Sequence, residues 1–262
     1  MMRFVASAVP FARLTAYWNL GYEGYFVPVN FSEAVLAQHV RAGSIDLERS
    51  VVLVEGDALL GFSLLGVRGE RGWIGGFGVA PAHRGHGLAQ TLIEEQLAIA
   101  RQAGLARVQL EVMCQNWAKK VYARAGFATT RDLVMLTATL PAAAAATSFS
   151  SRDGFAADHA RLHASAPACW QRELASLDAD PSGDVISVAD AILLTGRVGG
   201  ALRIRDAAAL ADADALLAAL AAHHPGEPVT IVNEPEGSPI HRALIALGAV
   251  EKLGQHEMHL EL

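Results

Sequence analysis

Two stretches in the first half of the chain show the clearest patterns of apolar and polar positions. Residues 73–80 form an apolar run, and residues 107–113 alternate polar and apolar side chains. The first pattern predicts a buried strand and the second a half-buried strand. Between them, apolar residues recur every three or four positions over residues 88–103, which predicts an amphipathic helix that ends at Gly104.

The connection from the first strand to this helix carries two closely spaced glycines, in Arg84-Gly85-His86-Gly87-Leu88-Ala89. Glycine has no Cβ, so successive backbone N–H groups can face one point. The helix N-terminus adds a partial positive charge there. The segment therefore suits an anion such as a pyrophosphate. It fits neither the Rossmann spacing nor a Walker A loop, and a plain strand-to-helix connection remains the alternative.

A short helix and a further strand follow the half-buried strand. Asn116 can cap this helix at its start, and Gly126 suits the position just past its end. In this order of strands, glycine turn and helices, residues 55–140 resemble the GCN5-related N-acetyltransferase (GNAT) superfamily, and the earlier residues resemble it loosely. The resemblance implies an α+β fold, with a mixed, mostly antiparallel sheet flanked by helices. It also implies an N-acetyltransferase, an acyltransferase that moves groups other than amino-acyl groups.

The resemblance assigns positions to acetyl-CoA, the expected cosubstrate. The strand before the turn would pair its backbone with the pantetheine arm, and the Val79 N–H would stabilise the oxyanion. The turn amides would bind the pyrophosphate, with the Arg84 side chain near a phosphate, and Asn116 would contact the cofactor arm. The expected cofactor-binding residues are Phe77, Gly78, Val79, Arg84, Gly85, His86, Gly87, Leu88, Ala89 and Asn116.

Three residues are candidates for catalytic proton transfer. By the resemblance, Tyr122 is the general acid that protonates the departing thiolate. The alternative for Tyr122 is an aromatic side chain packed in the core. Glu111, on the half-buried strand, and Glu23, in an aromatic-rich loop, are candidates to attract the amine or relay its proton. Both carboxylates could equally be ordinary surface charges.

The acceptor is expected to be a primary amine of a small molecule or peptide, which attacks the thioester directly. Tyr22 and Tyr25 lie in the region that walls the acceptor site in the family, and they are candidate substrate-binding residues. Gly75 and Gly76 are further candidates, because glycine inside a strand often marks a bulge or the close approach of a ligand. Together with Gly78 they could leave room for a longer acyl group.

The last part of the chain repeats the first in a weakened form. With a shift of 122 residues and no gaps, Gly126 falls on Gly248, and Leu136 falls on Met258. We therefore expect two tandem acyl-CoA N-acyltransferase folds. The expected ranges are a catalytic domain at 1–140, an alanine-rich linker at 141–147 and a degenerate copy at 148–262.

The second copy lacks the residues on which the chemistry of the first depends. After the strand expected at 201–205 there is no glycine turn, and Asp206 would repel phosphate. Leu244 stands in place of the candidate acid, and Ser238 stands in place of Asn116. We expect this copy to stabilise the pair or shape the acceptor cleft. A non-catalytic acyl-CoA sensor or interaction module is the alternative for the whole chain.

Charge and composition exclude several other classes of protein. Residues 1–140 carry 13 Lys and Arg against 11 Asp and Glu, which leaves 8 against 16 for the rest of the 21 and 27. This acidic second half has no basic cluster, so we expect no nucleic-acid partner. No apolar run reaches the ~18 residues of a membrane helix, and no convincing signal peptide is present. Two cysteines suit a cytoplasmic protein, and either a monomer or a homodimer is compatible with the sequence.

Seven of the ten histidines lie in the second half of the chain. His159 and His163 are four residues apart on an expected helix, a spacing that can bind zinc. No third ligand is evident in the sequence. We therefore expect no metal site.

Overall fold

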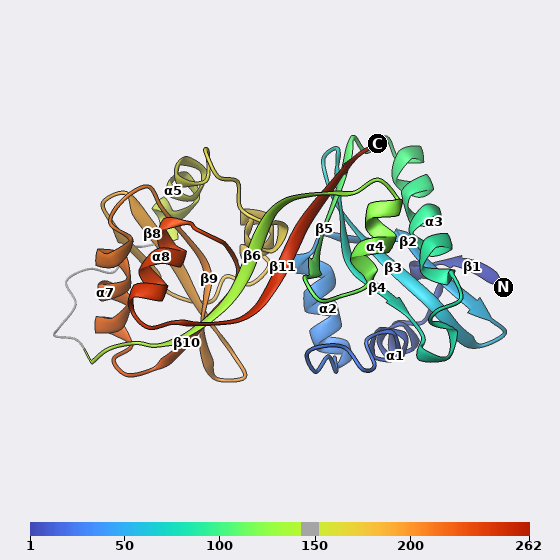
Figure 1. Cartoon of the computed structure of the whole chain (residues 1–262), viewed down its shortest axis with the longest axis horizontal. Coiled ribbons are helices and arrows are strands. Elements are labelled where there is room, and N and C mark those ends of the chain that lie inside the picture. Colours follow the sequence, from blue (N-terminus) through green and yellow to red (C-terminus); the bar gives the residue numbers. More distant parts are fainter. Residues whose placement is uncertain (143–151) are drawn as a thin grey trace. The chain divides into compact units, whose positions relative to one another are not determined.

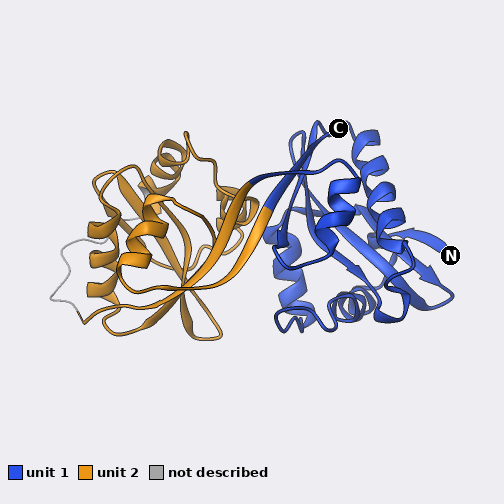
Figure 2. Ribbon diagram, viewed as in Figure 1, with its two compact units in different colours: residues 1–130, 257–262 blue, residues 131–256 orange. Residues whose placement is uncertain are grey.

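The computed structural model describes residues 1–142 and 152–262, and it contains an eleven-stranded sheet in the order β1-β2-β3-β4-β5-β11-β6-β10-β9-β8-β7 (Figure 1). The chain divides into two compact units. Unit 1 comprises Met1–Thr130 and Glu257–Leu262, and unit 2 comprises Arg131–His256 (Figure 2). Each unit has a mixed, mostly antiparallel sheet flanked by helices, which confirms the predicted fold class.

The elements of the first half are β1 (Met2–Val5), α1 (Phe11–Gly21), α2 (Glu33–Ala42), β2 (Ile45–Glu55), β3 (Ala58–Arg68), β4 (Arg71–Val79), α3 (Leu88–Gln102), β5 (Arg107–Met113), α4 (Ala118–Arg124) and β6 (Ala128–Thr139). The elements of the second half are α5 (Phe155–Leu162), α6 (Leu174–Leu177), β7 (Val185–Val188), β8 (Ala191–Val198), β9 (Ala201–Ala209), α7 (Ala213–His223), β10 (Pro228–Pro235), α8 (Pro239–Ala246) and β11 (Val250–Glu261). Short 3-10 turns precede α1, α3, α5 and α6.

Helices cover both faces of the sheet in unit 1, because side chains alternate between the faces along each strand. On β3, a Cβ at Gly61 would lie 3.3 Å from Leu92 of α3, whereas one at Gly21 of α1 would meet the ring of Phe62. The α3 face also holds α4, whose Tyr122 packs in the same core as Leu97. The helix predicted at 88–103 and the strand predicted at 107–113 are confirmed.

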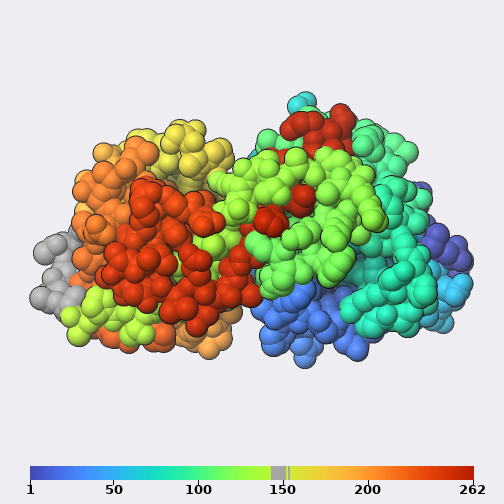
Figure 3. Space-filling view, in the orientation of Figure 1, coloured from blue at the N-terminus to red at the C-terminus, as the bar shows by residue number. Residues whose placement is uncertain are grey.

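The two units exchange their closing strands. β6 follows α4 of unit 1, but from Arg131 it belongs to unit 2, where Leu136 pairs with Ile231 of β10. The end of β11 returns to unit 1: Met258 joins its core, and the Leu262 N–H donates to the Ala106 carbonyl at 2.9 Å. Red C-terminal residues are accordingly seen among the green residues of unit 1 in Figure 3. The compact units therefore differ from the expected ranges 1–140 and 148–262.

Unit 2 repeats the arrangement of unit 1. On β8, Leu193 belongs to the core that holds α7 and α8, while its neighbours Ile192 and Leu194 pack with Phe155 of α5. β9 runs to Ala209 and is longer than the strand expected at 201–205. Asp206 therefore lies inside the strand and is buried, so the expectation that it stands in the turn was wrong.

Two further findings concern the expected linker and the membrane. Residues 143–147 of the expected linker lie outside the described residues. Among the residues that are described, every helix is too short or too polar to cross a membrane.

Candidate active site

The candidate site is a fork between two parallel strands of unit 1. β4 and β5 pair at only three positions, Arg71↔Arg107, Gly72↔Val108 and Trp73↔Gln109. Beyond these pairs the strands diverge. The register of β4 against β3 also shifts between Ile74 and Gly76, so Gly75 is the extra residue of a bulge. The prediction that glycine marks a bulge in this strand is confirmed at Gly75.

Backbone groups of β4 face this fork. The Ala80 N–H donates to the Leu60 carbonyl of β3, and backbone groups alternate in direction along a strand. Phe77 and Val79 therefore point their N–H and C=O groups into the fork, and Gly78 points its own toward β3. Two contacts agree: the Phe77 N–H donates to Tyr22 Oη at 3.4 Å, and Arg84 Nε donates to the Val79 carbonyl at 2.9 Å.

The glycine turn forms an open cradle of amides at the start of α3. Gly85 has φ +82° and Gly87 has φ +79°, conformations that favour glycine. Gly87 is also the residue before the first turn of α3, and no side chain caps that turn. Among the described residues, no protein acceptor takes a hydrogen bond from the amides of residues 85–89. The cradle therefore presents unpaired donors at a helix N-terminus, as an anion site requires.

The side chain of Arg84 is bonded to backbone carbonyls at the edge of the site. Its Nη2 donates to the carbonyls of Gly21 and Glu23 at 3.0 and 2.9 Å, in addition to the bond from Nε to Val79. Three backbone carbonyls therefore hold the guanidinium. Arg84 ties the end of α1 and the loop after it to the strand before the cradle.

Three tyrosines and Asn116 gather at the fork. Tyr122 is buried, and its ring packs edge-on against Phe77 at 5.5 Å. Burial, reinforced by the nearby hydroxyls of Tyr22 and Tyr25, raises the pKa of Tyr122 well above its ordinary value. Burial likewise raises the pKa of Tyr25, whose hydroxyl is hydrogen-bonded to the Asn116 side chain. These groups are therefore neutral hydrogen-bond donors and acceptors near pH 7.

Asn116 also sets the start of α4. Its Oδ1 accepts a hydrogen bond from the Ala118 N–H at 2.9 Å, and Gly126, with φ +101°, follows the helix end. Both predicted helix boundaries are confirmed. The capping bond fixes the Asn116 side chain, which leaves its amide directed at Tyr25.

An aromatic cluster lies on the α1 and α2 side of β4. Its rings are stacked, tilted or edge-on to one another at centroid distances of 4.8 to 6.1 Å. The members are Trp18, Tyr22, Phe31, His39, Phe62 and Trp73. A Cβ at Gly75 would lie 2.3 Å from the Trp73 ring, and a Cβ at Gly76 would lie 2.3 Å from the Trp18 ring. The glycines admit these indoles, so the space expected for a longer acyl group is filled.

The candidate carboxylates differ in their surroundings. Glu111 is half-buried, and its Oε2 accepts a hydrogen bond from Trp73 Nε1 at 2.7 Å. Glu23 is exposed, and its contact with the site is the hydrogen bond that its backbone carbonyl accepts from Arg84. The structure thus holds Glu111 at the aromatic cluster, and it leaves the side chain of Glu23 at the surface.

His39 is a residue that the sequence analysis missed. It lies on α2 and is in the aromatic cluster, and its Nε2 contacts the carbonyl of Gly75 at 2.7 Å. A carbonyl only accepts, so Nε2 carries the hydrogen. Burial lowers the pKa of His39, although the bond to Gly75 opposes this shift. The imidazole is therefore neutral near pH 7, and Nδ1 keeps its lone pair.

Comparison with known proteins assigns part of the chain to a family. Residues 16–127 match the Acetyltransferase (GNAT) family. The chain contains a GNAT-family domain. The matched residues include the fork, the cradle and Tyr122, and they fall within unit 1. No curated protein sequence matches the chain.

Solved structures show that the GNAT fold is present twice. A GCN5-related N-acetyltransferase from Sphaerobacter thermophilus has a TM-score of 0.72 at 14% identity, covering 99% of this chain and 95% of that one. A tandem GNAT protein from the clavulanic acid biosynthesis pathway has a TM-score of 0.66 at 14% identity, with coverage of 96% and 94%. For a GCN5-related N-acetyltransferase from Anabaena variabilis ATCC 29413 the TM-score is 0.62 at 17% identity, with coverage of 98% and 72%. The whole chain has the tandem GNAT fold.

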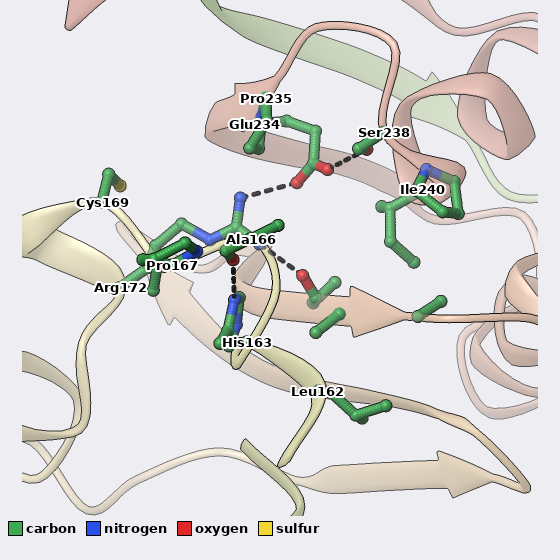
Figure 4. A pocket seen from close by; sticks show the side chains of 15 residues that line it. Leu162, His163, Ala166, Pro167, Cys169, Arg172, Glu234, Pro235, Ser238 and Ile240 are labelled. Atoms are coloured by element: carbon green, nitrogen blue, oxygen red, sulfur yellow. Dashed lines mark hydrogen bonds and ion pairs between the residues drawn. The ribbon is translucent and has the colours of Figure 1, made fainter. Parts of the chain in front are cut away.

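The second GNAT fold has a fork of its own, but a side chain fills it. β9 and β10 also pair at only three positions before they diverge, Leu202↔Val229, Arg203↔Thr230 and Ile204↔Ile231. The buried Arg172 bridges the diverging ends, donating to Asp206 and the Ala207 carbonyl on one strand and to Glu234 on the other, at 2.9, 2.6 and 2.6 Å. Figure 4 shows Arg172 facing Glu234 across this space.

Little room remains in the second fork. The cavity there has a volume of about 60 Å³, enough for a few small atoms. The turn before α7 contains no glycine and is followed by Asp212 and Asp214. In the described part of unit 2, Arg172 thus bridges the fork, and the glycine cradle of unit 1 has no counterpart.

Proposed function

We propose that this chain is a cytoplasmic, acetyl-CoA-dependent N-acetyltransferase with one acyl-CoA site, in unit 1. The acceptor in this proposal is a primary amine of a small molecule or peptide. One observation carries the proposal: the unpaired amides of residues 85–89 follow β4, whose Phe77 and Val79 direct backbone groups into the fork, and the ring of Tyr122 packs on Phe77. A diphosphate, a pantetheine arm and a leaving thiol require these groups in that order.

The transfer needs two proton movements and one stabilised oxyanion. The amine nitrogen attacks the thioester carbonyl, whose oxygen becomes negative and takes a hydrogen bond from the Val79 N–H. The C–S bond then breaks, and the Tyr122 hydroxyl protonates the thiolate. Burial raises the pKa of Tyr122, which by itself makes the hydroxyl a weaker acid. The same burial also disfavours a charged thiolate beside it, so the two effects on the proton transfer partly offset each other.

His39 is the proposed base, ahead of the two carboxylates considered from the sequence. Its neutral imidazole can accept the proton that the attacking amine loses, while the bond from Nε2 to Gly75 fixes the ring. Gly75 is the bulge residue of β4, two residues before Phe77, so this bond holds His39 at the fork. Glu111 then has an electrostatic role, attracting the cationic amine.

Replacing His39 by Gln tests this assignment. A glutamine amide can keep the bond to Gly75, but it cannot accept a proton. We expect kcat/KM at neutral pH to fall by about 10- to 100-fold, less than a full acid–base contribution because water can relay the proton. Because burial lowers the pKa of His39, kcat/KM of the wild type should also fall on the acid side of the ordinary histidine range as His39 is protonated. This decrease is well separated from titration of the amine at ~10. A His39→Gln variant that keeps this acid limb contradicts the assignment.

Matched amide substitutions distinguish the roles of the two carboxylates, Glu111 and Glu23. Gln at position 111 still accepts the bond from Trp73, so Glu111→Gln removes only the charge. We expect the KM for the amine to rise about tenfold with kcat little changed, as for a partly buried charge worth ~1.4 kcal/mol. Glu23→Gln should leave both constants unchanged, because its side chain is exposed. The reverse ranking in steady-state kinetics would assign the electrostatic role to Glu23.

The non-catalytic alternative is an acyl-CoA sensor, and a transfer assay separates it from an enzyme. Thiol release from acetyl-CoA is followed with a panel of small amines and peptides with free amino groups. We expect amine-dependent release above the rate without amine. Tight acetyl-CoA binding with no amine-dependent release across the panel would favour the sensor.

A further inference from the structure

A cluster of metal-binding side chains lies in unit 2, apart from the candidate active site. His159 and His163, at the end of α5, and Asp206, on β9, bring one donor atom each to within 4.8 Å of the others. All three side chains are largely buried. The sequence analysis did not find Asp206 as a third ligand, because 43 residues separate it from His163.

The hydrogen bonds of His163 leave one nitrogen facing an anion. Its Nδ1 faces the Ala166 carbonyl at 3.1 Å, so Nδ1 carries a hydrogen (Figure 4). Its Nε2 faces Asp206 Oδ2, also at 3.1 Å. The other oxygen of Asp206, Oδ1, accepts a hydrogen bond from Arg172 Nε at 2.9 Å, so the carboxylate is paired with a guanidinium as an anion. In a neutral imidazole, the Nε2 lone pair would meet this anion, so a cation is needed between them.

The charges of the surrounding buried side chains also call for a cation. Arg172 contributes one positive charge to the cluster, and the buried Asp206 and Glu234 contribute two negative charges. The buried group is therefore short of one positive charge. A proton on His163 would supply it, and a divalent ion would more than supply it.

The separations between the donor atoms are compatible with a bound metal ion. The Arg172 carbonyl is a fourth donor and lies 2.9 Å from His159 Nε2, while Asp206 Oδ2 lies 3.6 Å from the same nitrogen. With its hydrogen on Nε2, His159 donates to this carbonyl, and with its hydrogen on Nδ1 it offers a lone pair to a metal. Three of the separations among these two nitrogens and two oxygens are 2.9, 3.1 and 3.6 Å, and the donor atoms of His159, His163 and Asp206 all lie within 4.8 Å of one another. In a tetrahedral site with bonds of ~2.0–2.1 Å, neighbouring ligands are about 3.3 Å apart.

We infer that His159, His163 and Asp206, with the Arg172 carbonyl, form a binding site for one divalent transition-metal ion of the Zn²⁺ class. The Nδ1–H bond from His163 to Ala166 fixes the tautomer that exposes Nε2 to a metal. The Arg172 guanidinium binds the other oxygen of Asp206 and orients the carboxylate. The ion joins α5, the turn of residues 170–172 and β9, so its role is to hold the filled fork of unit 2 closed.

Cobalt titration of the metal-stripped full chain tests the inference, because Co²⁺ takes the same ligands and absorbs visibly when tetrahedral. We expect one equivalent per chain with tetrahedral intensity, displaced by Zn²⁺, and a rise in melting temperature on binding. His163→Ala and Asp206→Asn should each weaken binding by more than about 100-fold, beyond the effect of losing an outer-shell partner. His241→Ala is the matched control, since His241 lies on α8 and bonds to Glu251 instead.

The cobalt titration of the wild-type chain tests the metal site even if a variant fails to fold. Absence of stoichiometric tetrahedral absorption would overturn the metal site and leave a protonated His163 as the cation. Binding that is unchanged in folded His163→Ala would also overturn it, by placing the ion elsewhere. Neither result depends on acetyltransferase activity, so the metal site and the proposed function stand or fall separately.

Discussion

Replacing Tyr122 by Phe is expected to lower kcat by about 10²- to 10⁴-fold, the usual contribution of a general acid. The ring contacts with Phe77 and Phe127 survive in the variant, so packing at the fork is kept. The dissociation constant of acetyl-CoA should stay within about threefold, because the hydroxyl acts on the leaving thiolate and not on bound cosubstrate. Thiol-release kinetics and calorimetry measure the two constants.

Tyr17→Phe is the matched control for this loss. Tyr17 is also a buried tyrosine of unit 1, but its hydroxyl donates to the Asp57 carbonyl at 2.9 Å. It should keep wild-type turnover. Normal turnover in Tyr122→Phe would exclude Tyr122 as the acid and direct attention to Tyr22, whose hydroxyl also lies at the fork.

Replacing Gly87 by Glu is expected to weaken acetyl-CoA binding by more than about 100-fold, since a carboxylate would repel the diphosphate at the cradle. Part of the effect would be strain, because Gly87 has φ +79° and a left-handed conformation costs about 1–2 kcal/mol for other residues. Gly87→Ala measures that strain without the charge. Binding to Gly87→Glu should therefore be far weaker than binding to Gly87→Ala.

Gly56→Glu controls for the same strain and charge elsewhere in unit 1. Gly56 has φ +58° in the turn between β2 and β3, with open space around a Cβ. It should bind acetyl-CoA as the wild type does. Equal losses in Gly56→Glu and Gly87→Glu would attribute the effect to unit 1 as a whole and contradict the cradle.

The sequence predicted those parts of unit 1 that local signals determine. The strand at 107–113, the helix after the glycine turn, the Asn116 cap and the position of Gly126 all follow from spacing and capping rules. The bulge at Gly75 also carried a local signal, a glycine pair inside an apolar strand. These features depend on residues close in the chain, which is why one sequence sufficed.

Features that depend on distant contacts were missed. The exchange of β6 and β11 pairs strands about 90 or more residues apart, and both strands have the same alternation whichever unit they join. Arg84 matched a motif, but the direction of its side chain is set by α1. His39 and Arg172 carry no motif, and their roles come from the carbonyls and carboxylates that tertiary packing brings to them.

The central claim is that the chain has one acyl-CoA site and that this site lies in unit 1. Calorimetric titration of acetyl-CoA into the wild type and into Gly87→Glu tests it most directly. The account predicts one site per chain in the wild type and its loss in the variant. Two sites, or one site that survives in Gly87→Glu, would contradict the assignment to unit 1, and the absence of binding to the wild type would contradict the acetyltransferase itself.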